Sequence, residues 1–70
     1  MKDLEFLNES QLEALIRYVH KDIDQMRDKL ELVASTGNYD KVANVSGSIT
    51  AMRYLIADCR SQIAAYRKRG

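Results

Sequence analysis

Cysteine, histidine and proline are nearly or entirely absent from this chain of 70 residues. The sequence has one cysteine, Cys59, one histidine, His20, and no proline. A lone cysteine excludes a disulfide within the chain, and these two ligands are too few for the four-ligand cluster of a structural zinc site. Because so short a domain buries proportionately little surface, it needs a metal, disulfides or oligomerisation for stability. Association is therefore the expected source of the missing stability.

Long hydrophobic runs and a large excess of either charge sign are missing as well. The first seven residues contain Asp3 and Glu5 and no long apolar stretch, so we expect neither a signal peptide nor a membrane span. Eleven Lys and Arg residues against ten Asp and Glu give a net charge of +1. Composition alone therefore predicts no membrane or nucleic-acid partner. We expect a cytoplasmic protein in which any electrostatic function depends on where the charges lie.

Residues 7–12 have the pattern of a helix start. Asn8 is expected as the N-cap, with Gln11 completing a capping box, although a cap at Ser10 would shift the start by two residues. Gly37 suits the left-handed position that ends many helices, and Asn38 or Asp40 would cap a second helix. These signals predict an N-terminal arm over 1–8 and a single domain over 9–70. Within that domain we expect helices over about 9–35 and 40–69, joined by a turn at 36–39.

The apolar residues of both predicted helices repeat at alternating intervals of three and four, which is the heptad pattern of coiled coils. Two such seams joined by a short turn fold back on each other. Pairs of residues whose numbers sum to 75 then place an apolar partner opposite each seam residue of the first helix. The predicted fold is all-α, a coiled-coil-like antiparallel two-helix hairpin. The seam residues are Leu12, Ile16, Val19, Ile23, Met26, Leu30 and Val33 in the first helix, and Val42, Val45, Ile49, Met52, Ile56, Cys59, Ile63 and Tyr66 in the second.

A lone hairpin is one layer thick, and apolar elements are stably buried only when a second layer covers them. Leu15 and Leu55 lie at g positions on the same side of the hairpin and widen the apolar stripe, and Phe6 adds apolar surface in the arm. Gly47 and Ala57 belong to a stripe of small residues that would let another helix come close, or else to an ordinary exposed helix face. We expect a homodimer packed as a four-helix bundle, or a higher even-numbered oligomer.

Catalytic and metal-binding patterns do not stand out. His20 and Cys59 make a Cys–His couple conceivable, yet Cys59 occupies a seam position, where a buried thiol is inert. The carboxylates of the first helix face outward, whereas a di-iron bundle needs carboxylates that project inward. We therefore expect a non-enzymatic protein with no cofactor and no metal. The outward-facing carboxylates are Asp22, Asp24, Asp28 and Glu31.

Basic residues, by contrast, recur at the e positions on one side of the predicted hairpin. Arginine has a planar fork that suits phosphate or carboxylate, so this side, flanked by Tyr66, is a candidate surface for an anion or a partner. The alternative is a solvated face on which Glu13 pairs with Arg60 across the hairpin. The basic e positions are His20 and Arg27 in the first helix and Arg53, Arg60 and Arg67 in the second.

These features favour a small oligomerising interaction protein that binds a protein partner through its helix faces. By analogy of size and fold, it suits an adaptor, an inhibitor, or a viral, phage or mobile-element factor that acts on a host protein. One alternative is a binder of small anionic, nucleotide-like ligands in an arginine and tyrosine pocket between subunits. Another is a nucleic-acid-associated protein that uses the basic side and the tail of Arg67, Lys68 and Arg69.

Overall fold

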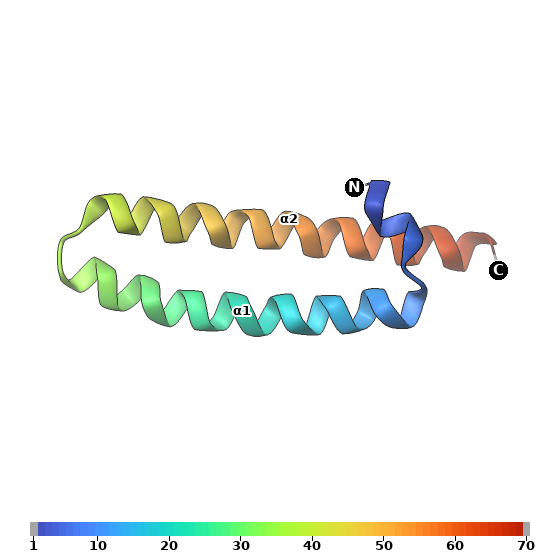
Figure 1. Cartoon of the computed structure of the whole chain (residues 1–70), viewed down its shortest axis with the longest axis horizontal. Helices are drawn as coiled ribbons and strands as arrows, with labels where there is room; N and C mark the ends of the chain where they lie inside the picture. Colours follow the sequence, from blue (N-terminus) through green and yellow to red (C-terminus); the bar gives the residue numbers. More distant parts are fainter. Residues whose placement is uncertain (1, 70) are drawn as a thin grey trace.

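The computed structural model describes residues 2–69, which form three helical elements and no strand. A short 3-10 helix, η1, spans Lys2–Phe6, and two long α-helices follow, α1 over Glu9–Ser35 and α2 over Tyr39–Arg69. The two α-helices run antiparallel and are joined by a tight turn, while η1 lies beside the C-terminal part of α2 (Figure 1). The prediction of an all-α hairpin is confirmed.

The ends of the helices follow from local hydrogen bonds. Asn8 Oδ1 accepts a hydrogen bond from the Gln11 backbone N–H at 2.8 Å, and Gln11 Oε1 accepts one from the Asn8 N–H at 2.9 Å. This reciprocal capping box sets the start of α1 at Glu9. At the turn, Gly37 has φ of +74°, which is the left-handed region that favours glycine. Asn38 rather than Asp40 caps α2, because Asn38 Oδ1 accepts from the Lys41 N–H at 3.2 Å.

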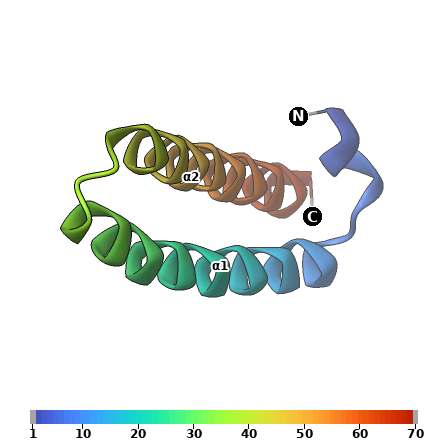
Figure 2. The same cartoon turned by 60° about the vertical axis from the view of Figure 1, so that its left-hand side comes forward.

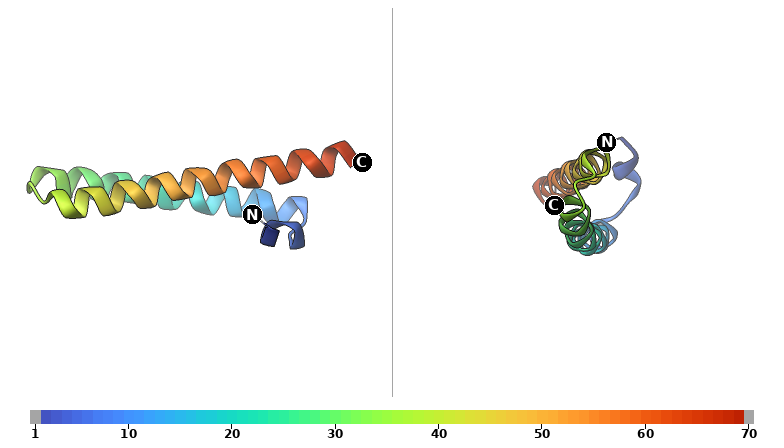
Figure 3. Two further views of the ribbon diagram at one scale, coloured as in Figure 1. Left: turned by 90° about the horizontal axis from the view of Figure 1, so that it is seen from above. Right: turned by 90° about the vertical axis from the view of Figure 1, so that its left-hand side faces the viewer.

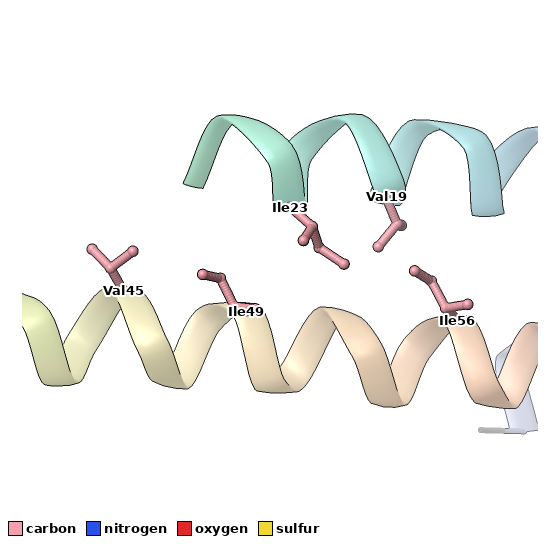
Figure 4. Close-up of a cluster of buried hydrophobic side chains, with 5 residues drawn as sticks. All are labelled: Val19, Ile23, Val45, Ile49 and Ile56. Atoms are coloured by element: carbon pink, nitrogen blue, oxygen red, sulfur yellow. The ribbon is translucent and has the colours of Figure 1, made fainter. Parts of the chain in front are cut away.

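The core lies along the predicted seam, of which no residue is exposed. Figure 4 shows Val19 of α1 facing Ile56 of α2, in agreement with the predicted register. Leu12 and Ile63, another predicted pair, belong to a second cluster near the start of α1. The cluster in the middle of the hairpin contains Val19, Ile23, Val45, Ile49 and Ile56, and the second cluster contains Leu4, Leu12, Cys59 and Ile63.

The N-terminal arm closes one end of the hairpin. Figure 2 shows the arm reaching from the start of α1 across to α2. Leu4 is buried in the second cluster, and the Tyr66 hydroxyl lies 2.7 Å from the Leu7 carbonyl oxygen and 3.0 Å from that of Glu5. At this end Leu12 and Cys59 are both 0% exposed. The arm thus acts as a third element that completes the core locally.

Elsewhere the molecule is a single layer of two helices, as the end-on view in Figure 3 shows. Its principal extents are 50 × 18 × 16 Å. The radius of gyration is 15.0 Å, compared with about 11 Å for a compact domain of this length. Neither α-helix within residues 2–69 combines the length and the apolar character that crossing a membrane requires.

Candidate functional site

The e positions of α1 and α2 face the same side of the hairpin and line a groove of about 320 Å³. The basic residues that the sequence places on this side come together here, with the exception of Arg67. Asp24 is the acidic residue among the lining side chains. The groove is lined by His20, Ile23, Asp24 and Arg27 from α1 and by Ile56, Arg53 and Arg60 from α2.

The helical repeat positions these side chains. His20, Asp24 and Arg27 are spaced at intervals of four and three, so they share one face of α1. Arg53 and Arg60 are seven residues apart, which places them about 10 Å from each other along the axis of α2. Both helices are held at this point by the buried core that forms the floor of the groove. The backbone positions of the basic residues are therefore fixed even though their ends lie in solvent.

The charges of the groove are only partly balanced within the chain. Among the described side chains, no carboxylate oxygen lies within 4.0 Å of the guanidinium groups of Arg27, Arg53 or Arg60. Three guanidinium groups against the Asp24 carboxylate leave an excess of two positive charges when His20 is neutral. The chemistry available here is the binding of phosphate or carboxylate groups by arginine forks.

Arg67 lies outside the groove, where it forms the ion pairs of the hairpin's closed end. Its Nε is 2.6 Å from Glu9 Oε1, and its Nη2 is 3.5 Å from Glu13 Oε1. The expected pair of Glu13 with Arg60 is therefore not the one observed. Helical side chains lean toward the N-terminus of their own helix, so in this antiparallel pair Glu13 and Arg60 lean away from each other. The same lean brings Arg67 back toward Glu13.

Tyr66 is also separate from the groove. Its hydroxyl contacts the backbone of the arm, and its side chain lines a different hollow together with Phe6 and Leu7. The structure therefore does not bring Tyr66 together with Arg53 and Arg60. Sequence reasoning missed the contact between Tyr66 and the arm because its acceptors are backbone carbonyls, which every residue type carries.

The residues expected at an oligomer interface differ widely in exposure. Leu15 and Leu55 are half-buried and pack against both core clusters within the single chain. Phe6 is 86% exposed, and Gly47 and Ala57 are exposed on α2. A Cβ added to Gly47 would meet nothing within 4 Å, so packing within the chain does not explain that glycine.

His20 and Cys59 lie in different environments. His20 is on the exposed wall of the groove, whereas Cys59 is in the core. Burial raises the pKa of the Cys59 thiol, and the negative charge of Asp58 raises that pKa further. Both effects keep the sulfur protonated and poorly nucleophilic. Residues 2–69 contain no group of three or more His, Cys, Asp or Glu side chains that could hold a metal ion.

No protein-family model matches this chain, and no curated protein or solved structure matches it either. Its function must therefore be inferred from its own residues and their arrangement.

Proposed function

We propose that the protein is a non-enzymatic interaction protein that self-associates and binds a protein partner through its helix faces. The observation that carries this proposal is an excess of exposed surface. The chain exposes 5411 Å², whereas a compact monomer of 8.0 kDa exposes about 4450 Å². The surplus of roughly 950 Å² is close to the ~800 Å² that each partner buries in an interface of standard size.

The seam supports the same proposal at the end near the turn. Met26, Leu30, Val33 and Val42 are only half-buried, and the arm does not reach this end of the hairpin. Burying more of each apolar side chain would contribute about 25 cal/mol for every Å² removed from water. A helix of a partner protein can supply that cover.

Sedimentation equilibrium tests self-association directly. Over a concentration range of about 10 to 500 μM, the expected mass is twice 8.0 kDa or a higher even multiple of it. A compact, stably folded monomer at every concentration would contradict the proposal.

A second candidate function is the binding of small anionic, nucleotide-like ligands, and the unbalanced arginines of the groove favour it. Inorganic pyrophosphate is a suitable probe, with the Nε–H resonances of Arg27, Arg53 and Arg60 as the readout. We expect these three to shift on titration while those of Arg67, which is already paired, shift little. Equal small shifts of all arginines would instead indicate a solvated face. Nucleic-acid association is the weaker alternative, because the net charge is +1 and Asp24 lies in the groove.

The arginine fork provides a sharper version of this test. The double variant Arg53→Lys and Arg60→Lys keeps both positive charges but loses the paired donors of each guanidinium. We expect it to bind pyrophosphate more weakly than the parent and more tightly than the corresponding double alanine variant. Identical affinities for all three proteins would rule out the groove as the anion site.

A further inference from the structure

The outer face of α1, opposite the core, carries two of the large exposed apolar side chains of the molecule. Tyr18 is 70% exposed and Leu32 is 69% exposed. They are fourteen residues apart, which is two full heptads, so both lie on the same line along the helix. At 1.5 Å per residue their separation is about 21 Å. No element of residues 2–69 covers this line.

Charges on the same face are separated into two blocks. Arg17 and Lys21 lie in the N-terminal half of the helix. Asp24, at the edge that this face shares with the groove, follows them together with Asp28 and Glu31. All five are exposed, and none forms an ion pair within 4.0 Å among the described side chains.

Residues three and four apart are neighbours on the helix surface, so like charges within each block repel each other, while Lys21 has an opposite charge nearby only in Asp24. Arg17 and Lys21 are four apart and both positive, and Asp24 and Asp28 are four apart and both negative. An opposite charge from outside the chain would offset each of these costs.

We infer that two copies of this chain pair antiparallel through the outer faces of α1, an inference that rests on the proposed self-association. The two-fold axis lies between Asp24 and Gln25. An antiparallel copy placed on this axis brings Lys21 opposite Asp28 of the partner subunit, and Arg17 close to Glu31 of the partner subunit. Tyr18 comes close to Leu32 of the partner subunit, which gives each exposed apolar side chain a contact. Asp24 faces the uncharged Gln25 of the partner subunit. Two-fold symmetry makes every such contact occur twice.

Charge reversal tests this pairing. In Lys21→Glu or Asp28→Lys, the changed residue of each copy meets a like charge of the partner subunit. This repulsion occurs twice in the dimer, so its dissociation constant should rise about tenfold at low salt. The double variant Lys21→Glu and Asp28→Lys regenerates both attractive contacts with their signs exchanged. It should return the dissociation constant to within about threefold of the parent value. Analytical ultracentrifugation measures the constants, and circular dichroism checks that helix content is unchanged.

Two control variants separate this face from the rest of the surface. Lys29→Glu makes the same change in charge as Lys21→Glu but lies at a g position of α1, so it should leave the dissociation constant nearly unchanged. Ala57→Glu places a charge on the small-residue face of α2 and should also have little effect.

The outcomes distinguish this inference from the proposed function. If the parent dimerises, but Ala57→Glu dissociates it and the charge reversals do not, the interface lies on α2. The pairing through α1 is then overturned while self-association stands. Failure of the double reversal to restore association would also overturn the pairing. A parent protein that is monomeric throughout would overturn both.

Discussion

The two ends of the hairpin contain seams of similar apolar character but bury them to different degrees. At the end where the arm packs, Leu12 and Cys59 are completely buried, Tyr66 contacts the backbone of the arm, and Arg67 pairs with Glu9. At the end near the turn, Leu30, Val33 and Val42 remain half-buried. In the middle of the hairpin the two helices alone bury the central core cluster, so the contrast is confined to the two ends. The arm therefore covers the seam at one end, whereas no element of residues 2–69 covers it near the turn, where we propose that a protein partner packs.

The largest expected loss of stability comes from replacing a seam leucine by alanine, which can be done once at each end of the hairpin. Leu12→Ala removes a leucine that is 0% exposed, and buried leucines cut to alanine typically cost about 2 to 5 kcal/mol. Leu30→Ala removes a half-buried leucine and should cost about half as much. Thermal melting monitored by circular dichroism measures both. Equal losses of stability would show that the arm does not make its end of the core tighter.

An intermediate effect is expected from loosening the arm alone. Tyr66→Phe removes the hydroxyl that contacts the carbonyl oxygens of Leu7 and Glu5, and losing such a hydrogen bond costs roughly 1 kcal/mol. Because the arm helps to bury the second core cluster, its release should speed alkylation of Cys59. The rate of reaction with iodoacetamide at fixed pH measures this. Tyr54→Phe, on an exposed part of α2, is the matched control and should react as the parent does.

The pH dependence of the same thiol has a defined sign. Burial raises the pKa of Cys59 in the folded state above that of an unfolded thiol, which is about 8.5. A group whose pKa is raised on folding contributes stability that is complete below the unfolded pKa and is lost as pH rises toward the folded value. Stability should therefore decline above about pH 8.5, and Cys59→Ala should remove that part of the decline. Parallel pH profiles for parent and variant would contradict this.

The smallest effect is expected at the surface ion pairs of the closed end. The side chains of Arg67 and Glu9 are 66% and 41% exposed, and exposed pairs of this kind contribute up to about 1 kcal/mol. Arg67→Ala should lower the melting temperature slightly, and less so at high salt. Arg60→Ala, which breaks no ion pair among the described residues, should leave the melting temperature unchanged.

Features set by residues close together in the sequence could be predicted from it, whereas contacts between distant residues could not. The seam was predictable because burial repeats with the helix itself, and the caps were predictable because Asn8 and Gln11 are three residues apart. The basic side of the groove followed from the same heptads. The pairing of Arg67 with Glu13 was not predicted, since it depends on how far each side chain leans along its helix. The contact of Tyr66 with the arm joins residues about sixty positions apart through backbone atoms.

We propose that this hairpin self-associates, and thermal unfolding at two protein concentrations tests that proposal most directly. If folding is coupled to dimerisation, a hundredfold increase in concentration stabilises the dimer by about 2.7 kcal/mol. Going from about 5 μM to about 500 μM should therefore raise the midpoint of unfolding by roughly 5 to 10 °C. A midpoint that is the same at both concentrations would show that the single hairpin is stable by itself, and would contradict the claim.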